Sequence, residues 1–201
     1  MPQSRQDFRR HIRQKRNQLC VSTQKQASLD LVQQFSAWIK HTHYQHIALY
    51  LANDGELDTT PLIHALWAQD KQIYLPVLHP FSPGNLLFLH YTPDSPMVTN
   101  KYGIAEPRLD IRRIRPAHQL DLIGTPLVGF DSQGQRLGMG GGYYDRTLAN
   151  WFKTGVGPTP FGIAHDCQHV EQLPVEEWDI PLPTILTPSQ IWQWEFPMNT
   201  V

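Results

Sequence analysis

Glycine is concentrated in one short stretch of the 201-residue chain, at positions Gly138, Gly140, Gly141 and Gly142. The stretch follows an apolar run from Leu120 to Val128 and precedes a helix-like segment that begins at Tyr143. Because glycine has no Cβ, the backbone there can adopt positive φ and approach a ligand closely. The N-terminus of the following helix would point free N–H groups at an anion. The stretch therefore predicts a strand–loop–helix unit that cradles phosphate.

Two charged residues flank the glycines. Arg136 lies just before them and can offer a bidentate guanidinium to phosphate oxygens. Asp145 falls in the first turn of the predicted helix, where a carboxylate can hold Mg²⁺ against those oxygens. A simpler alternative is a glycine turn in which Asp145 only stabilises the helix dipole. The glycines alone do not decide between these two interpretations.

The known phosphate-binding fingerprints are absent from this region. Residues 129–134 have the opening spacing of a P-loop, but Gln135 and Arg136 follow where Lys and Ser or Thr are required. The dinucleotide-binding pattern G-x-G-x-x-G does not occur anywhere in the chain. The sequence therefore supports neither a P-loop NTPase nor a dinucleotide-dependent oxidoreductase.

Apolar periodicity predicts alternating helices and strands. Two helices come first, and the second runs from a cap at Ser22 or Thr23 to about Lys40. We expect its buried side to comprise Leu29, Val32, Phe35, Trp38 and Ile39. A helix opening at Thr59-Thr60-Pro61 and another over about 143–151 follow. Short apolar runs predict strands at 46–51, 72–77, 86–91, 120–128 and 161–164.

This alternation predicts a single-domain layered α/β fold over residues 1–201, with a mostly parallel sheet flanked by helices. In such sheets, ligands gather at the carboxyl ends of the strands. The polar, proline-punctuated region 93–116 is expected to be a long loop bordering the site. We expect the proline-rich C-terminal tail to wrap around the domain in an ordered form.

Composition restricts the partners. A net charge of −1 gives no general attraction to nucleic acid, and no apolar run is long enough to span a bilayer. Cys20 and Cys167 are the only two cysteines and show no zinc or disulfide spacing, which suits a reducing compartment. We therefore predict a cytoplasmic monomer that binds small molecules and neither nucleic acid nor membrane.

The first predicted helix is amphipathic and carries a stripe of arginines on its polar face. The stripe comprises Arg5, Arg9, Arg13 and Arg16. One interpretation is a phosphate-binding face, and the rival is a nucleic-acid-binding module. The rest of the chain offers no reader motif and no basic excess, which weighs against the rival.

The glycine stretch also closely resembles the signature of a known family. Residues 127–146 read LVGFDSQGQRLGMGGGYYDR and are similar to the signature of the 5-formyltetrahydrofolate cyclo-ligase family. Four other features agree with the family in order: the basic first helix, residues 50–59, KYGIAEP at 101–107, and WDIPLP at 178–183 followed by ILTP.

The resemblance implies an ATP-dependent ligase. In this reaction the formyl oxygen of 5-formyltetrahydrofolate attacks the γ-phosphate of ATP, and N10 then closes the ring to give 5,10-methenyltetrahydrofolate, ADP and phosphate. Mg²⁺ accompanies the ATP, and no protein nucleophile is required. The main rival among enzymes is another ATP-dependent transferase that uses the same scaffold on a different heterocycle.

The resemblance also implies roles for individual residues. Glu56 and Arg136 are the expected catalytic residues, with Glu56 either orienting the folate or deprotonating it near N10, and Asp145 is the expected metal ligand. The expected ATP-binding residues are Arg9, Arg13, Arg136, Gly138, Gly140, Gly141, Gly142, Tyr143, Tyr144 and Asp145. The expected folate-binding residues are Leu51, Glu56, Tyr102, Tyr143 and Tyr144.

Overall fold

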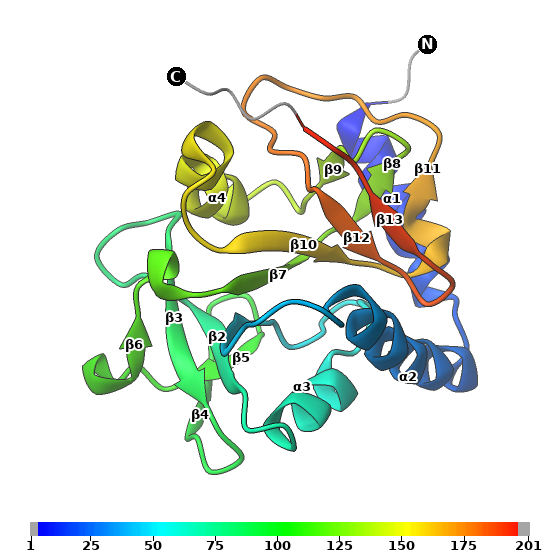
Figure 1. The fold of residues 1–201 in the computed structure, drawn as a ribbon. Coiled ribbons are helices and arrows are strands. Elements are labelled where there is room, and N and C mark those ends of the chain that lie inside the picture. Colours follow the sequence, from blue (N-terminus) through cyan, green and yellow to red (C-terminus); the bar gives the residue numbers. More distant parts are fainter. Residues whose placement is uncertain (1–3, 197–201) are drawn as a thin grey trace.

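Eight strands form one mixed sheet through the centre of the molecule (Figure 1). The computed structural model describes residues 4–196, and the strand order is β13-β12-β10-β7-β1-β2-β3-β6. The strands are β1 (His46–Ala48), β2 (Gln72–Leu78), β3 (Leu86–Tyr91), β6 (Ile114–Arg115), β7 (Leu122–Pro126), β10 (Thr159–Ile163), β12 (Thr184–Leu186) and β13 (Ile191–Gln193). Strands β12, β10, β7, β1 and β2 are parallel, whereas β13, β3 and β6 pair antiparallel at the two edges. The predicted α/β class is confirmed, with the parallel part at the centre.

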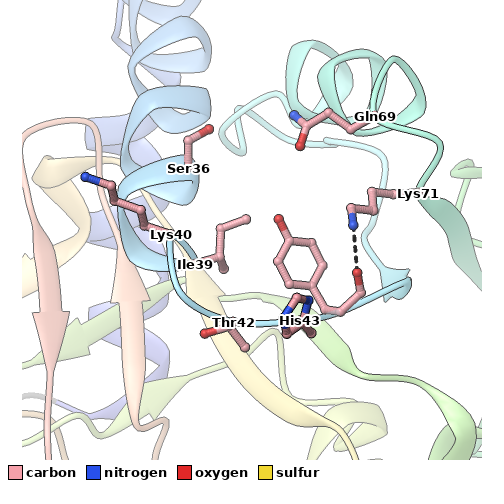
Figure 2. A pocket seen from close by; sticks show the side chains of 8 residues that line it. Ser36, Ile39, Lys40, Thr42, His43, Gln69 and Lys71 are labelled. Atoms are coloured by element: carbon pink, nitrogen blue, oxygen red, sulfur yellow. Dashed lines mark hydrogen bonds between the residues drawn. The ribbon is translucent and has the colours of Figure 1, made fainter.

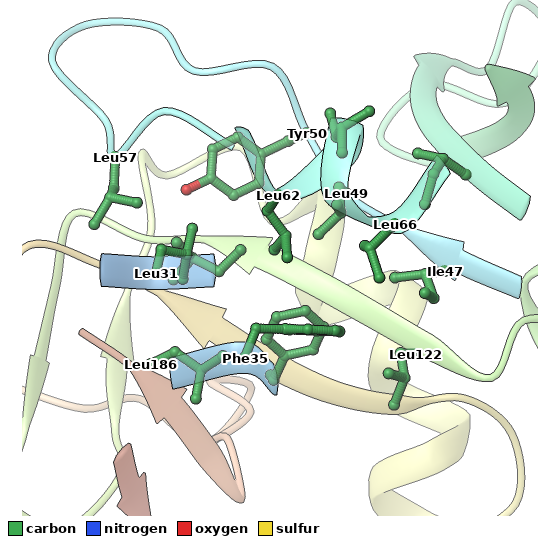
Figure 3. Close-up of a cluster of buried hydrophobic side chains, with 14 of the residues drawn as sticks. Leu31, Phe35, Ile47, Leu49, Tyr50, Leu57, Leu62, Leu66, Leu122 and Leu186 are labelled. Atoms are coloured by element: carbon green, nitrogen blue, oxygen red, sulfur yellow. The ribbon is translucent and has the colours of Figure 1, made fainter. Parts of the chain in front are cut away.

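Helices cover both faces of this sheet (Figure 1). Helices α2 (Val21–Trp38) and α3 (Thr60–Trp67) pack on one face and α4 (Tyr143–Thr154) on the other, whereas α1 (Arg5–Asn17) packs beside residues 129–131 and 166–168. Successive strand side chains point to opposite faces, so Ile47 and Leu49 enter the cluster packed by α2 and α3 (Figure 3). Ala48 enters a second cluster, which includes Leu148 of α4. The strands are therefore buried on both sides, as their near-continuous apolar runs indicated.

The predicted buried side of α2 was partly wrong. Its core residues are Ala27, Leu31 and Phe35, which follow one another at intervals of four. Leu29 is 46% exposed, because two residues along a helix turn the side chain about 200° away from Leu31. The predicted cap was also wrong: Cys20 occupies the N-cap position and no side chain caps the helix.

The predicted start of α3 is correct, but its first threonine acts differently. The Thr59 hydroxyl donates to the carbonyl of Tyr50 at the end of the first strand region, and does not cap the helix. Asp58 instead accepts from the backbone N–H of Thr60 at 2.9 Å. These contacts tie the start of α3 to the strand before it.

The strand predicted over 120–128 is interrupted. Strand β7 ends at Pro126, which cannot donate a ladder hydrogen bond, and the chain then joins a separate three-stranded sheet. That sheet contains β8 (Gly129–Asp131), β9 (Arg136–Leu137) and β11 (His169–Val170). The glycine stretch therefore follows β9 of the small sheet, and not the central strand as predicted.

Two regions are more regular than predicted. The expected loop at 93–116 contains a hairpin of β4 (Met97–Thr99) and β5 (Ala105–Pro107), followed by the edge strand β6. The C-terminal tail supplies β12 and β13, so it extends the sheet and does not merely wrap around it. Short 3-10 turns lie at Ile111–Arg113, Ala117–Gln119 and Asp166–Gln168. Residues 197–201 of the expected wrap lie outside the described part.

The strand order creates a switch point beside β1. The chain leaves β1 toward β2 on one side, whereas β7 lies on the other side of β1. Strands β1 and β7 are neighbours, and the segments that follow their carboxyl ends therefore lead away from each other. Such a divergence is where open α/β sheets bind ligands. The Glu56 turn follows β1, and the small sheet with the glycine stretch follows β7.

The corrected face of α2 is testable by truncation. Leu31→Ala removes a side chain with 0% exposure, and we expect it to lower the free energy of unfolding by about 2–5 kcal/mol. Leu29→Ala is the matched control and should change it by less than about 0.5 kcal/mol. Urea unfolding at 25 °C measures both. Equal losses for the two variants would contradict the assigned orientation of α2.

Candidate active site

The glycine stretch bends sharply before α4. Gly140 has φ of +98° and Gly142, which is the N-cap of α4, has φ of +65°. A side chain at either position would be strained. A Cβ at Gly141 would lie 2.8 Å from the ring of Tyr143, so a side chain there would displace that ring. No side chain caps α4, and its first N–H groups are therefore free for an anion.

Arg136 and Asp145 form a largely buried ion pair behind this loop. Arg136 Nη2 lies 2.5 Å from Asp145 Oδ1, and Arg136 Nε donates to the carbonyl of Ile180 at 3.0 Å. The Arg136 side chain is 3% exposed and that of Asp145 is 23% exposed. A Cβ built at Gly138 would lie 4.0 Å from Arg136 Nη1, so this nitrogen faces the glycine stretch. Arg136 is thus part of the frame of the loop.

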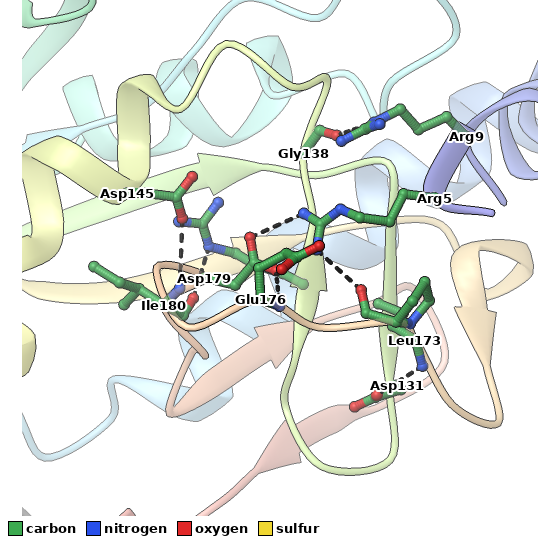
Figure 4. Close-up of polar contacts among 11 residues, drawn as sticks. Arg5, Arg9, Asp131, Gly138, Asp145, Leu173, Glu176, Asp179 and Ile180 are labelled. Carbon is green, nitrogen blue, oxygen red and sulfur yellow. Dashed lines mark hydrogen bonds and ion pairs between the residues drawn. The ribbon is translucent and has the colours of Figure 1, made fainter. Parts of the chain in front are cut away.

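A second carboxylate, Asp179, lies in the same polar cluster (Figure 4). Burial lowers the pKa of Arg136, and the charges of Asp145 and Asp179 oppose that shift. Asp179 Oδ1 accepts from Arg5 Nη2 at 2.9 Å. Burial alone would raise the pKa of Asp179, but the hydrogen bonds from Arg5 and from the N–H of Glu176, with the charges of Arg5 and Arg136, together hold it below its ordinary value. Sequence reasoning did not assign Asp179 or Arg5 to the site. Asp179 lies in the WDIPLP segment and Arg5 in the arginine stripe, and both segments were noted in the sequence. The sequence did not indicate that these two residues pair with each other.

The arginines of the α1 stripe differ in their partners and in their burial. Arg5 is paired with Asp179, and Arg16 is fully buried against Asp54, so the predicted stripe of four surface cations is wrong at those two positions. Arg9 remains beside the glycines, where its Nε donates to the carbonyl of Gly138 at 2.8 Å. Burial and the neighbouring Arg5 lower the pKa of Arg9, which indicates that an anion would be favourable there.

A hollow of about 310 Å³ opens between α1 and the glycine stretch. Its lining comprises Gln6, Arg9, Arg10, Arg13, Gln14, Asn17 and Met139. Among residues 4–196, no carboxylate lines this hollow, and Arg13 reaches it while also donating through Nε to Asp54 Oδ2 at 2.6 Å. The hollow combines three guanidinium groups with the glycine stretch, a suitable environment for a polyanion such as a triphosphate.

Glu56 lies in a closed turn after β1. Its Oε2 accepts from the N–H of Asn53 at 3.0 Å, and its own N–H donates to the carbonyl of Asn53 at 3.0 Å. Burial raises the pKa of Glu56 to about 6, while Asn53 and Arg16 oppose the shift. Leu51, which precedes the turn, is partly buried against the main apolar cluster. A carboxyl group with a pKa near neutrality suits proton transfer.

Three tyrosines connect the two parts of the site. Tyr102 lies in the turn of the β4–β5 hairpin, and its hydroxyl is 2.9 Å from that of Tyr143 at the start of α4. Their rings meet edge to face at 6.4 Å. Burial raises the pKa of Tyr144 well above its ordinary value, and the charge of Glu56 raises it further. Tyr144 thus lies within the electrostatic reach of Glu56, which joins the glycine stretch to the Glu56 turn.

Other candidate sites are limited. A hollow of about 250 Å³ at the amino ends of β1 and β2 is lined by Lys40, His43, Lys71 and neighbouring residues, none of which was a predicted site residue (Figure 2). Over residues 4–196, no three His, Cys, Asp or Glu side chains lie close enough together to hold a metal. None of the helices in that range has both the length and the apolar content needed to cross a membrane.

Comparison with known proteins identifies the family of this chain. A sequence profile of the 5-formyltetrahydrofolate cyclo-ligase family matches residues 1–188. The 5-formyltetrahydrofolate cyclo-ligase of Escherichia coli strain K12 is 53% identical over 185 residues, which cover 91% of this chain and 100% of that protein. The enzyme of the same name from Haemophilus influenzae is 49% identical over 184 residues, with coverage of 92% and 97%.

Two solved structures have a fold similar to that of this chain. The NMR structure of Aquifex aeolicus 5,10-methenyltetrahydrofolate synthetase superposes with a TM-score of 0.78 and 25% identity, covering 98% of this chain and 97% of that one. A 5,10-methenyltetrahydrofolate synthetase from Mycoplasma pneumoniae, at 23% identity and a TM-score of 0.73, has the same fold. The family profile over residues 1–188 and the 53% identity to the Escherichia coli enzyme show that this chain belongs to the 5-formyltetrahydrofolate cyclo-ligase family.

Proposed function

We propose that the protein catalyses the ATP-dependent cyclisation of 5-formyltetrahydrofolate to 5,10-methenyltetrahydrofolate, with release of ADP and phosphate. The observation that carries this proposal is the convergence of a phosphate-cradle loop and an acidic turn at the carboxyl ends of β7 and β1, in a chain of this family. The cradle would hold ATP, and the acidic turn would hold the folate. Both substrates would meet at the switch point of the sheet.

The first step joins the formyl oxygen to the γ-phosphorus. A new oxygen–phosphorus bond forms, the bond to the β-phosphate oxygen breaks, and ADP leaves. The N–H groups of Gly138–Gly142 and of the first turn of α4 would hold the phosphates together with Arg9, Arg13 and Arg136. Their contribution is to position the reactants and to stabilise the charge of the transferring phosphoryl group.

Mg²⁺ is the cation that we propose to accompany ATP. Mg²⁺ in nucleotide sites usually takes one or two carboxylates and completes its shell with phosphate oxygens and water. Asp145 fits this requirement, because Oδ1 accepts from Arg136 and the second oxygen remains on a carboxylate that is 23% exposed. When bound, the ion would neutralise part of the triphosphate charge.

The second step closes the ring. N10 attacks the activated formyl carbon, phosphate leaves, and the proton on N10 must go to a base. We assign that role to Glu56, since its pKa of about 6 leaves it ionised near neutral pH yet able to accept a proton. Leu51, Tyr102, Tyr143 and Tyr144 would enclose the flat pterin, which favours aromatic walls. Shielding the activated intermediate from water prevents its hydrolysis.

The remaining expectations follow from this reaction. All the proposed site residues come from one chain, so we propose that a monomer suffices for activity. Folate and ATP would be the partners, with no role for nucleic acid or membrane. A cytoplasmic location suits an enzyme that consumes ATP.

The reaction itself is tested by mixing the purified protein with Mg-ATP and 5-formyltetrahydrofolate. We expect the methenyl chromophore to appear only when ATP is present, with one ADP formed per methenyl product. Folate-independent ATP hydrolysis, or ATP consumption with a different heterocycle and none with this folate, would contradict the proposal.

Glu56→Gln tests the proposed base. The variant preserves the acceptor for Asn53, and kcat should fall by roughly 100-fold or more while ATP binding persists. In the unmodified protein, kcat/KM for folate should rise with pH through about 6 and then level off, because the base must be ionised. The variant should lose this limb of the pH profile.

The same substitution should raise stability. The folded pKa of Glu56 lies above its ordinary value of 4.5, so ionisation costs stability as pH rises from about 4.5 to 6. That shift corresponds to about 2 kcal/mol, and Glu56→Gln should recover up to this amount at pH 7. Unfolding at pH 4 and pH 7 measures the difference. If Glu56→Gln had a normal kcat, Glu56 would not be the base, and its role would be limited to stabilising the turn that contains it.

Asp145→Asn tests the proposed metal ligand. The amide retains an acceptor for Arg136 but lacks the charge, so we expect a loss of about 1–3 kcal/mol in stability. The magnesium concentration that gives half-maximal activity should rise at least about 10-fold.

Assays below the melting temperature of the variant separate the two effects of Asp145→Asn. Asp166→Asn is the matched control, because it alters a carboxylate that accepts a hydrogen bond from the Ser189 hydroxyl. It should leave the magnesium concentration for half-maximal activity unchanged. An unchanged magnesium requirement in Asp145→Asn would exclude Asp145 as the ligand.

A further inference from the structure

We infer that Asp54 is a positioning residue that couples the two substrate sites: it competes with phosphate for Arg13 and anchors the turn that carries Glu56. The inference rests on the proposed function, because it takes Arg13 as a ligand of ATP and Glu56 as a group that acts on the folate. Asp54 itself was not among the predicted site residues. Its role follows from its contacts.

Asp54 is the meeting point of three side chains of α1. Its Oδ2 lies 2.6 Å from Arg13 Nε and 2.9 Å from Arg16 Nη2. Its Oδ1 accepts from Asn17 Nδ2 at 3.2 Å, and its backbone carbonyl accepts from Arg16 Nε at 2.8 Å. Four hydrogen bonds therefore dock this one turn residue onto the helix that lines the cationic hollow.

The backbone of this turn is held in an unusual conformation. Asp54 has φ of +51°, a left-handed value that non-glycine residues seldom adopt, and Gly55 follows with φ of +72°. A Cβ at Gly55 would lie 2.4 Å from Asn17 Oδ1, so the turn is pressed against α1. Such conformations persist only where surrounding contacts hold them. Here the contacts with α1 supply that restraint.

Glu56 is fixed by the same turn. Two hydrogen bonds with Asn53, one through the Glu56 carboxylate and one through its backbone N–H, close the turn around Asp54. A displacement of Asp54 would therefore move Glu56. The two residues also interact through charge, since Asp54 raises the pKa of Glu56 and Arg16 lowers it.

The two arginines on Asp54 differ in their freedom to move. Arg16 is 0% exposed and also donates to the carbonyl of Leu127 at 3.3 Å, so it is fixed. The Arg13 side chain is 42% exposed and lines the hollow beside Arg9. Arg13 can therefore turn toward a phosphate, while Arg16 continues to hold Asp54. One guanidinium serves two anions, and the carboxylate of Asp54 opposes the binding of ATP.

Asp54→Asn separates the two roles. Asparagine tolerates positive φ and keeps a side-chain oxygen, but it lacks the charge that restrains Arg13. The dissociation constant of a non-hydrolysable ATP analogue, measured by calorimetry with Mg²⁺, should fall about 2–5-fold, the range expected from losing a partly exposed ion pair. kcat/KM for 5-formyltetrahydrofolate should fall at least about 10-fold, because the Glu56 turn loses its charged anchor. If Asp54 were only structural, Asp54→Asn would weaken binding of the ATP analogue and also lower kcat/KM for the folate.

Two further variants complete the test. In an Arg13→Gln background, Asp54→Asn should no longer tighten binding of the analogue. Asp121→Asn is the matched control: its carboxylate accepts from the N–H groups of Gln45 and His46 at the amino ends of β1 and β7. Asp121→Asn should lower the melting temperature, but it should not tighten binding of the ATP analogue while lowering kcat/KM for the folate. If Asp54→Asn does not fold, Arg13→Gln in the otherwise unmodified protein, which keeps the contacts of Asp54 with Arg16, should weaken binding of the analogue, and unchanged binding would overturn the inference.

The outcomes are distinct. Parallel weakening of both substrates, or unchanged binding of the analogue, would overturn the inference. If the unmodified protein forms no methenyl product, the proposed function fails, while binding of the analogue to the Arg13 and Asp54 variants still reports on the competition for Arg13.

Discussion

The buried guanidinium of Arg16 organises both halves of the site. It is 0% exposed and donates to Asp54 in the turn after β1 and to the carbonyl of Leu127, just after β7. A buried charge is costly unless it is paired and fully hydrogen-bonded, so these partners hold each other strictly in place. Through Arg16, α1 fixes the two chain segments that leave the switch point of the sheet. Arg16 thereby fixes the position of the proposed folate-binding turn relative to the small sheet that leads to the glycine stretch.

The Arg136–Asp145 pair has a comparable function on the other side of the glycine stretch. It joins β9 to the first turn of α4, and the carbonyl of Ile180 brings the C-terminal segment to the same point. Asp145 therefore contributes to stability as well as to the proposed binding of Mg²⁺. This differs from a helix-dipole carboxylate, whose contribution is smaller and local. Glu56 differs from Asp145, because burial raises the pKa of its carboxyl group and its ionisation therefore costs stability.

Local patterns predicted much of this molecule, and long-range pairing much less. Glycine clustering located the loop before α4, and apolar periodicity located the helices and the central strands. Periodicity did not distinguish Leu29 from Leu31, because apolar and polar residues are intermixed along α2 and tertiary packing selects the buried face. The partners of Arg5, Arg16 and Arg136 lie 174, 38 and 9 residues away along the chain, so an arginine stripe could not show which cations are neutralised. The family resemblance implied roles for residues but not these pairings.

In the proposed reaction, the formyl oxygen of the folate becomes bonded to the γ-phosphorus of ATP before the ring closes. The most direct measurement follows the oxygen atom. The protein is supplied with Mg-ATP and 5-formyltetrahydrofolate carrying ¹⁸O in its formyl group, and the released phosphate is analysed by mass spectrometry. We expect each released phosphate to carry the labelled oxygen, because the formyl oxygen leaves bound to phosphorus. Unlabelled phosphate formed together with methenyl product would contradict it.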